Sequence, residues 1–395
     1  MNELEIIKQG VDTIIGEDDL IEKLNNKKIL NVKLGLDPSA PDIHLGHTVV
    51  LRKAKQLQDL GHNVIIIIGD FTGRIGDPTG KNKMRKQLSK EEVKENAMTF
   101  CEQVFKILDK EKTTIRFNSE WLESMNFSDV LELASSTTVS QLLTRDDFNN
   151  RFINQIPIGL HEFFYPLMQG FDSVAIDADI EIGGTDQTFN VCMGRTLQKQ
   201  RGNDTPQTIL LMPIIEGLDG IQKMSKSLNN HIGINEKPEV MFKKCMEIPD
   251  NLIIRFAELV TEFKPEDIKK LKERLEMNEN PRNIKLDLTR HIVGLFNPKE
   301  DVEMAEKFFV DAFQKNTIPE NIPELVINSN ILIQIFPKLV EENFAKSNGE
   351  LRRLVKQNGL KLNGEIIKDI NIEINDGDVL KIGKKVFVKL KTGQN

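Results

Sequence analysis

Four short runs of apolar and β-branched residues occur in the first part of the chain, and each ends in a polar loop that contains glycine. They span residues 28–36, 64–68, 180–182 and 208–215, with helix-like patterns between them. Such runs are typical of strands buried on both faces of a parallel sheet. They predict an α/β fold. In an open parallel sheet, ligands bind beyond the carboxyl ends of the strands, so the four loops are expected to converge on one site.

The later part of the chain has a different pattern. From about residue 237 to residue 314 charged residues alternate with apolar ones at helical spacing, which predicts an α-helical domain. A stretch with Pro319 and Pro323 follows, and the chain then resumes as two short helices and several strands, with turns at Asn363-Gly364 and Asp376-Gly377. A length of 395 residues suggests two or three domains. We therefore expect domains at 1–232, 233–328 and 329–395.

Charge is distributed unevenly along the chain. The net charge of −7 argues against a uniformly basic protein that coats nucleic acid. Residues 348–395 nevertheless contain ten Lys or Arg against six Asp or Glu, and residues 81–94 contain six against two. Clustered positive charge favours contact with phosphates, because binding releases counterions. An ordinary solvated surface produces the same pattern, so charge alone leaves both interpretations open.

Cysteine usage and apolar runs predict a cytoplasmic protein. Cys101, Cys192 and Cys245 lie at least 53 residues apart, without the spacing of a zinc site or a disulfide framework. The N-terminus has acidic residues where a signal peptide requires basic ones. The longest apolar runs, 64–68 and 209–215, are far shorter than the roughly 20 residues of a membrane span.

Two short motifs are candidates for phosphate chemistry. His44-Leu45-Gly46-His47 precedes a predicted helix over 48–60, so that its imidazoles and the helix N-terminus can face a polyphosphate together. A metal site is disfavoured because no further ligand has supporting spacing. Residues 223–227, KMSKS, carry two lysines and two hydroxyl groups between glycines, as a loop that closes on phosphates requires. Taken singly, the first motif is more often coincidental and the second is equally well an exposed basic turn.

The segment GRIGDPTGKN resembles a nucleotide-binding P-loop but departs from it. The pattern GxxxxGK[ST] requires glycine at position 75 and serine or threonine at position 82, where this chain has Ile75 and Asn82. A P-loop kinase or GTPase is therefore disfavoured, although the loop still has the character of a ligand-binding element.

With HLGH, KMSKS, GDPTGK and GGTDQ in this order, the sequence resembles the class I aminoacyl-tRNA synthetases, and among them the bacterial tyrosyl-tRNA synthetase family. The words DPSAPDIHLGHTVVL, FYPLMQGFDSV and GGTDQTFN are similar to the second of two bacterial branches. The resemblance covers the whole chain. It implies a Rossmann-type catalytic domain, then a helical anticodon-binding domain, then a small α+β RNA-binding domain like that of ribosomal protein S-four.

The resemblance also implies roles for individual residues. Those that match the tyrosine site are Asp37, Asp77, Tyr165, Gln169, Asp172, Asp186 and Gln187, with Asp172 as acceptor of the phenolic hydroxyl. Those that match the ATP site are Gly35, Ser39, His44, Gly46, His47, Lys223, Met224, Ser225, Lys226 and Ser227. The implied catalytic group is His44, His47, Lys81, Arg85, Lys223 and Lys226. We further hypothesise that Arg352, Arg353, Lys356, Lys384 and Lys385 contact the tRNA backbone.

The implied reaction joins the carboxylate of L-tyrosine to the α-phosphate of ATP, expels pyrophosphate, and then transfers the tyrosyl group to tRNA(Tyr). It needs no protein nucleophile, because positioning and charge stabilisation carry such displacements. ATP is a substrate, Mg²⁺ accompanies it, and no tightly bound protein metal is expected. The family is homodimeric.

Two other interpretations stay open at this stage. A tryptophanyl synthetase shares the class I motifs, but would not be expected to have the GGTDQ word or a carboxylate at Asp172. A catalytically idle RNA-binding protein on the same frame would have no physical need for intact HLGH and KMSKS.

Two residues raise questions of their own. The more familiar branch has a substrate-contacting tyrosine where this chain has Lys33, which either donates to the phenolic oxygen or points elsewhere. Tyr165 is the only tyrosine in a chain that contains 21 phenylalanines. If residues around it form a helix, Gln169 and Asp172 follow at i+4 and i+7, on the same face.

Overall fold

The computed structural model describes residues 2–26, 29–38, 42–79, 89–313, 322–383 and 386–392. By packing, the chain forms two compact units, one of Met1–Lys237 with Lys244–Phe296, the other of Pro238–Lys243 with Asn297–Asn395. This division does not test the expected functional domains at 1–232, 233–328 and 329–395, which stay a prediction.

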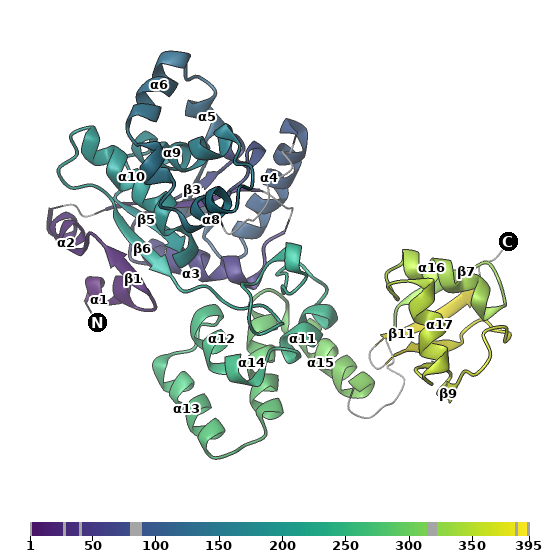
Figure 1. Ribbon diagram of the computed structural model, residues 1–395. Helices are drawn as coiled ribbons and strands as arrows, with labels where there is room; N and C mark the ends of the chain where they lie inside the picture. Colours follow the sequence, from purple (N-terminus) through teal and green to yellow (C-terminus); the bar gives the residue numbers. More distant parts are fainter. Residues whose placement is uncertain are drawn as a thin grey trace. The chain divides into compact units, whose positions relative to one another are not determined.

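The first unit is built on a six-stranded sheet with the strand order β1-β6-β5-β2-β3-β4 (Figure 1). Its strands are β1 (Thr13–Ile15), β2 (Asn31–Leu36), β3 (Asn63–Ile68), β4 (Thr113–Phe117), β5 (Ile180–Gly184) and β6 (Thr208–Met212). Strands β6, β5, β2, β3 and β4 are parallel, and β1 is antiparallel to β6. The predicted α/β fold is therefore confirmed, and each of the four apolar runs overlaps a strand of this sheet.

The order in which successive strands are added to the sheet reverses between β2 and β5. The chain passes from β2 outward to β3 and β4, and then returns to place β5 on the other side of β2. Such a switch point leaves a crevice beyond the carboxyl ends of its two strands, because the connecting helices leave on opposite faces. The predicted ligand site should therefore lie beyond β2 and β5.

Helices cover both faces of this sheet (Figure 1). Helix α3 (Leu45–Asp59) packs against β2, β3 and β5, while α9 (Leu160–Ala175) and α10 (Thr188–Gln200) pack against each other and α10 against β5 and β6. The other helices of the unit are α1 (Glu3–Lys8), α2 (Glu17–Asn26), α4 (Lys90–Val104), α5 (Ser119–Leu122), α6 (Phe127–Ser135), α7 (Val139–Leu142), α8 (Asp146–Ile153), α12 (Ile253–Val260), α13 (Pro265–Glu276) and α14 (Pro281–Gly294). Alternation along β2 turns Val32 and Leu34 to one face and Lys33 and Gly35 to the other.

The second unit contains α15 (Lys299–Phe313), α16 (Phe336–Glu341) and α17 (Asn348–Lys356), and a five-stranded sheet in the order β7-β11-β10-β8-β9. The strands are β7 (Glu324–Ile327), β8 (Leu360–Leu362), β9 (Glu365–Ile366), β10 (Val379–Ile382) and β11 (Val386–Thr392). Helix α11 (Pro238–Met246) begins in this unit and ends in the first.

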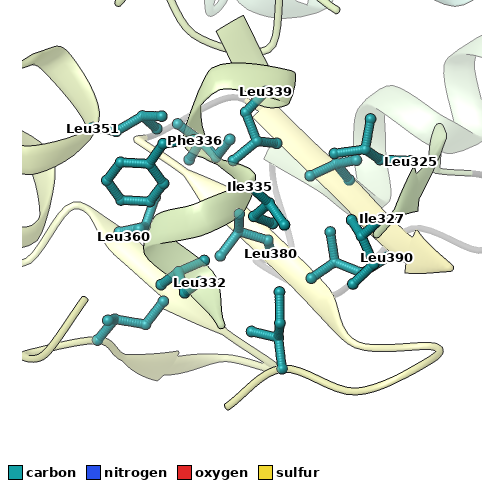
Figure 2. Packing of buried hydrophobic residues seen from close by; sticks show 14 of the residues in the cluster. Leu325, Ile327, Leu332, Ile335, Phe336, Leu339, Leu351, Leu360, Leu380 and Leu390 are labelled. Carbon is teal, nitrogen blue, oxygen red and sulfur yellow. The ribbon is translucent and has the colours of Figure 1, made fainter. Parts of the chain in front are cut away.

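A compact apolar core holds the C-terminal sheet and its helices together. Phe336 and Leu339 of α16 and Leu351 of α17 pack on Leu380 and Leu390 of the sheet (Figure 2). The predicted turns are present: Asn363 and Gly364 have φ of 50° and 92°, and Gly377 has φ of 83°. These left-handed conformations are what glycine and asparagine tolerate. Strand β7 was not predicted, because it lies in the proline-bearing stretch that was interpreted as a connection.

Candidate functional site

The first group of site residues lies directly beyond β2. Asp37 follows the strand, and one of its carboxylate oxygens accepts a hydrogen bond of 2.8 Å from the hydroxyl of Tyr165 on α9. The other oxygen accepts a hydrogen bond of 2.8 Å from Thr72 Oγ1, in the loop after β3. Gly69 makes this approach possible, since a Cβ there would lie 1.9 Å from the Asp37 carboxylate. The hydroxyl of the only tyrosine of the chain thus bonds to Asp37, a residue that is predicted to bind the substrate.

A second carboxylate, Asp172, is buried one turn further along α9 from Gln169. It is 3% exposed. Its Oδ1 accepts from Trp121 Nε1 at 2.8 Å and its Oδ2 accepts from Asn118 Nδ2 at 3.3 Å. Burial raises the pKa of the Asp172 carboxyl to about 7, against the lowering effects of Lys33 and of these two hydrogen bonds. Tyr165, Gln169 and Asp172 lie on α9 at the predicted spacing.

Lys33 does not extend freely into the site. Its Nζ is paired with Glu181 Oε1 at 2.9 Å and donates to the carbonyl oxygen of Gln169 at 2.7 Å and to Ser173 Oγ at 2.8 Å. Of the two roles left open for this lysine, the structure therefore supports the one in which its ammonium is directed to protein groups. The predicted contact of Gln169 with substrate is not tested, and its backbone carbonyl is occupied by Lys33.

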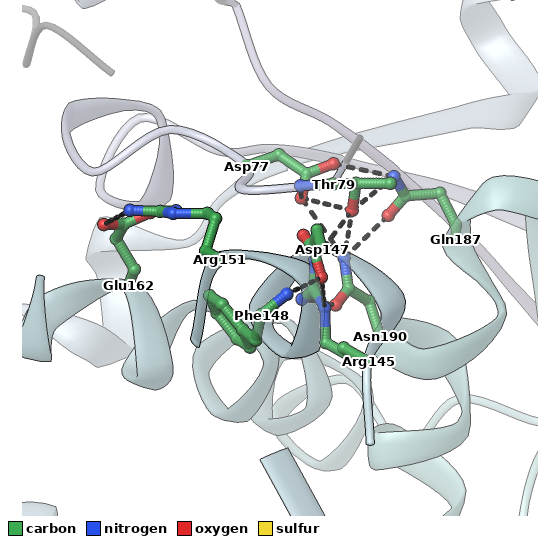
Figure 3. Close-up of polar contacts among 9 residues, drawn as sticks. All are labelled: Asp77, Thr79, Arg145, Asp147, Phe148, Arg151, Glu162, Gln187 and Asn190. Atoms are coloured by element: carbon green, nitrogen blue, oxygen red, sulfur yellow. Dashed lines mark hydrogen bonds and ion pairs between the residues drawn. The ribbon is translucent and has the colours of Figure 1, made fainter. Parts of the chain in front are cut away.

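A polar network surrounds Gln187 and Asn190, which follow β5 at the start of α10. Figure 3 shows its residues. Gln187 Nε2 donates to Asp77 Oδ2 at 2.7 Å, and Asn190 Nδ2 donates to Gln187 Oε1 at 2.9 Å. Thr79 Oγ1 donates to Asp77 Oδ1 at 2.6 Å. Arg145 completes the network by donating to Asn190 Oδ1 at 2.8 Å. The structure thus brings together the predicted pair Asp77 and Gln187.

Sequence reasoning missed several members of these networks. Asn190 and Arg145, with Asn118 and Trp121 around Asp172, received no role. Asn190 stood in the word GGTDQTFN, three residues after Gln187, so helical spacing could have indicated it. Arg145 carried no such signal, because its pairing with Asp147 at 2.7 Å and its stacking over Phe148 appear only in the folded chain.

The HLGH segment forms the beginning of α3. His44 is the N-cap, and its Nδ1 accepts a hydrogen bond of 3.1 Å from the amide of Gly46, while its own amide donates to His47 Nδ1 at 3.3 Å. A side chain at position 46 would collide with the His44 ring, at 2.9 Å. Burial lowers the pKa of His44 far below its usual range and that of His47 to about 4, assisted at His47 by Lys223 and Lys226. Both imidazoles are neutral at pH 7.

The KMSKS loop lies against this segment. Single β-bridges connect His44 with Gly233 and Glu216 with Lys223, on either side of the loop. Met224 is buried. The backbone amide of Ser225 donates a hydrogen bond of 2.8 Å to Asn230 Oδ1. Lys226 Nζ is paired with Asp42 at 2.8 Å, and Lys223 with Asp186. Ser225 and Ser227 are bonded to each other through their hydroxyls at 2.9 Å.

Other predicted positions have simpler outcomes. Gly35 lies in β2 and is exposed, and a Cβ there would meet nothing within 4 Å, so there is open space over this strand. Arg352, Arg353 and Lys356 are exposed on α17. Ser39, Lys81, Arg85, Lys384 and Lys385 lie outside the described residues.

Among the residues that the structure describes, no group of three or more His, Cys, Asp or Glu side chains is arranged to hold a metal ion. Within the same residues, no helix combines the length and apolarity that crossing a membrane requires.

The fold and these motifs together define a class. Residues 25–314 match the family model of class I tRNA synthetases of the W and Y group, and the chain belongs to this family.

Curated relatives narrow the comparison to tyrosine. The chain is 52% identical over 400 residues to a tyrosine–tRNA ligase of Carboxydothermus hydrogenoformans, covering 98% of this chain and 97% of the relative. It is 48% identical over 395 residues to that of Thermotoga maritima, covering 99% and 98%. Among solved structures, the tyrosyl-tRNA synthetase of Archaeoglobus fulgidus complexed with L-tyrosine is similar with a TM-score of 0.64 at 24% identity, covering 76% of this chain and 98% of that one. At this identity the structural likeness supports the fold alone.

Proposed function

We propose that this protein is a tyrosine–tRNA ligase. It activates L-tyrosine with ATP, releasing pyrophosphate, and then transfers the tyrosyl group to the 3′ end of tRNA(Tyr). The observation that carries the proposal is the grouping of Asp37, Tyr165, Gln187 and Asp172 at the β2/β5 switch point. The phosphate motifs meet each other close to the same switch point, since the bridge from His44 to Gly233 joins them and Lys223 is paired with Asp186 after β5.

Asp172 is the residue that selects tyrosine. A buried carboxylate whose two oxygens already accept from Trp121 and Asn118 retains lone pairs for the substrate's phenolic O–H. Phenylalanine would leave this carboxylate desolvated and without that donor. Tyrosyl enzymes are themselves the standard example of such rejection, which reaches about 10⁴–10⁵.

The opposite end of the tyrosine is bound by polar groups beyond the strands. Asp37 and Asp77 provide carboxylates for the substrate ammonium, and Tyr165 and Gln187 orient these carboxylates through hydrogen bonds of 2.8 Å and 2.7 Å. Asn190 donates a hydrogen bond to Gln187 and accepts one from Arg145, which fixes the orientation of the Gln187 side chain. The nucleophile is the substrate carboxylate itself, which needs no base because it is ionised in solution.

ATP occupies the space over Gly35 and the start of α3. The imidazoles of His44 and His47 are neutral, so they donate N–H hydrogen bonds to the phosphates without adding positive charge. Lys223 and Lys226 exchange their carboxylate partners for phosphate oxygens as negative charge moves onto pyrophosphate. Lys81 and Arg85, in the basic segment 81–94, contribute further positive charge. Mg²⁺ accompanies ATP and is held chiefly by the phosphates.

The C-terminal unit binds tRNA. On α17, Leu351 and Val355 face the apolar core, so that Arg352, Arg353 and Lys356 are turned to solvent. Lys384 and Lys385 add to the positive charge of this part of the chain. Deleting the residues after Asn330 should spare tyrosine-dependent pyrophosphate exchange while aminoacylation falls by at least about tenfold, as the loss of several phosphate contacts predicts. Equal loss of both activities would contradict this role.

The working form is a cytoplasmic homodimer. Six large apolar side chains between α6 and the start of α9 are more than half exposed in the single chain: Phe127, Leu131, Val139, Phe152, Ile153 and Leu160. Exposed apolar residues at this density are typical of a surface covered by a partner. Sedimentation of the wild type and of Phe152→Glu/Ile153→Glu tests this, and a monomeric wild type would contradict it.

The experiment that tests the function is ATP–pyrophosphate exchange with each of the twenty amino acids. Exchange that depends on tyrosine alone supports a tyrosine–tRNA ligase. Exchange with tryptophan would indicate the other member of the family pair, and exchange with none would indicate an RNA-binding protein without catalysis.

A further inference from the structure

Lys33 is a buried lysine in the central strand of the sheet. It is 0% exposed, and each of its three N–H donors has a partner among the described residues, on Glu181, Gln169 and Ser173. The pairing joins three elements, because Lys33 belongs to β2, Glu181 to β5 and the other two to α9.

The carboxylate of Glu181 also has hydrogen-bond donors other than Lys33. Ser173 Oγ donates to Glu181 Oε2 at 3.0 Å, and the Gln207 amide donates to the same oxygen and to the carbonyl of Val191 at 3.1 Å. A buried ion pair of this kind is weak support for stability, since well-packed apolar residues of similar volume stabilise a fold equally well or better. The pair therefore calls for a role other than stability.

Its position relative to the tyrosine site supplies that role. Lys33 bonds to Gln169 and Ser173, which bracket Asp172 on α9, so the ammonium fixes the turn of helix that carries the acceptor carboxylate. In both β2 and β5 the residue two positions further on is a glycine, Gly35 and Gly183. Because side chains alternate along a strand, the Lys33–Glu181 pair lies one layer beneath these glycines, on the same face of the sheet.

The charges that face Asp172 come from two strands. Burial raises the pKa of the Asp172 carboxyl, Lys33 on β2 lowers it, and Glu181 on β5 also raises it. Asp172 also accepts from Trp121 and Asn118, which are neutral. The ammonium of Lys33 is therefore the charge in this layer that opposes protonation of the acceptor.

We propose that Lys33 is a positioning residue for tyrosine selection, which holds the Asp172 turn of α9 in place and supplies the buried positive charge that keeps Asp172 an ionised acceptor. The inference rests on the proposed function, since it assigns Asp172 to the phenolic hydroxyl. Because the donors of Lys33 are used within the protein, Asp172 meets the phenolic hydroxyl as an acceptor and Lys33 donates nothing to it.

The test compares a paired apolar replacement with the wild type. In Lys33→Met/Glu181→Leu both charges are removed together, so neither is left buried and unpaired. Tyrosine affinity is measured from pH 6 to pH 8.5 through the fluorescence of Trp121, the only tryptophan and a direct partner of Asp172. We expect the affinity at pH 7.5 to fall at least about threefold, with recovery toward the wild-type value at pH 8.5, because raising a pKa of about 7 by one unit lowers the ionised fraction of the carboxyl at pH 7.5 about threefold. The preference for tyrosine over phenylalanine in pyrophosphate exchange should fall by a similar factor.

A matched control removes another buried lysine of the same unit. Lys23 of α2 is paired with Asp179 at 3.3 Å and is nearly as buried, but it bonds to the carbonyls of Asp179 and Pro206, which lie outside α9. Lys23→Met should lower thermal stability and leave the pH profile and the selectivity of the wild type unchanged.

A single substitution keeps the inference testable if the double variant does not fold. Glu181→Gln removes the like charge, so the acid limb of tyrosine binding should move to lower pH, opposite in sign to the double variant. A folded double variant with the wild-type profile and selectivity, or a Glu181→Gln profile that stays in place, would overturn the positioning role. A wild type without tyrosine-dependent exchange would instead overturn the proposed function, so the two failures are distinguishable.

Discussion

The two ends of the site are built in opposite ways. Around Asp172 the polar groups are buried and bonded to one another, with Lys33 at 0% exposure and Asp172 at 3%. Around the phosphate motifs the lysines are accessible: the side chain of Lys223 is 54% exposed and that of Lys226 is 23% exposed. One end is fixed by the fold before any substrate arrives, and the other holds its charges in exchangeable pairs.

This difference corresponds to two chemical tasks. Rejecting phenylalanine requires a polar group that water cannot reach, and hence a site that is dry and already organised. Promoting the displacement requires charges that bind more tightly as pyrophosphate forms. Exposed ion pairs contribute only about 0–1 kcal/mol, so Lys223 and Lys226 can leave Asp186 and Asp42 for phosphate at little cost.

The largest effect should come from the buried end. Asp172→Asn should reduce kcat/KM for tyrosine in pyrophosphate exchange by about 10³-fold or more, because the ionised acceptor is lost. Thermal stability at pH 8 should rise or stay unchanged in the same variant. The folded-state pKa of Asp172, about 7, lies above the ordinary value, so above pH 7 the protein bears the cost of a buried charge that asparagine lacks. A large fall in melting temperature would show that Asp172 serves the fold instead.

The exposed end should respond in rate and not in tyrosine affinity. Lys226→Ala should lower kcat of exchange by about 10²-fold, the size expected for removing one group that stabilises transition-state charge. The Kd for tyrosine, followed by Trp121 fluorescence, should stay within about twofold of the wild type. If tyrosine affinity fell together with kcat, the two ends would not be separable.

The pH dependence of tyrosine binding should report the buried end alone. Asp172 is mostly protonated below its pKa of about 7, so tyrosine affinity should fall about tenfold between pH 8 and pH 6. His47, whose pKa is lowered to about 4, and His44, whose pKa is lower still, stay neutral across this range. Fluorescence titrations at several pH values check this, and a midpoint that persists in Asp172→Asn would assign the titration to another group.

The smallest effect concerns the hydroxyl of Tyr165, which links α9 to Asp37 beyond β2. Tyr165→Phe removes its hydrogen bond to Asp37, which is worth about 0.5–1.5 kcal/mol, and should weaken tyrosine binding about two- to tenfold. Because the ring is retained, the melting temperature should change little. Calorimetry and equilibrium binding measure the two quantities separately.

Much of the first sheet could be predicted from the sequence, and the exceptions have physical reasons. Strands β3 and β6 appear as nearly continuous apolar runs, and β2 and β5 are largely buried and apolar apart from Lys33 and Glu181, so each could be recognised as a strand. Strand β4, with the sequence TTIRF at the sheet edge, is only partly buried and mixes polar with apolar residues. Strand β1 has three residues, too few to show a pattern. Helix α3 begins at Leu45 and not at Thr48, because the imidazole of His44 takes the capping role that serine, threonine, aspartate or asparagine usually has.

The site divides in the same way. The motif residues could be identified because their order and spacing match a family, even though Tyr165 and Gln187 bond to partners more than 100 positions away. Trp121 and Arg145 stand in no such motif, and their contacts with Asp172 and Asn190 appear only in the folded chain. The orientation of Lys33 was equally undetermined, because its partners on β5 and α9 come together only when the sheet is assembled.

The presence of a single tyrosine, Tyr165, also affects how synthesis of the protein depends on charged tRNA. Phenylalanine occupies 21 positions of the chain, and tyrosine only the one whose hydroxyl has a partner in the substrate site. A ribosome translating this protein therefore meets a single tyrosine codon. For an enzyme that produces tyrosyl-tRNA, a shortage of tyrosyl-tRNA slows translation of the enzyme at only one codon. The enzyme can therefore still be made when charged tRNA is scarce.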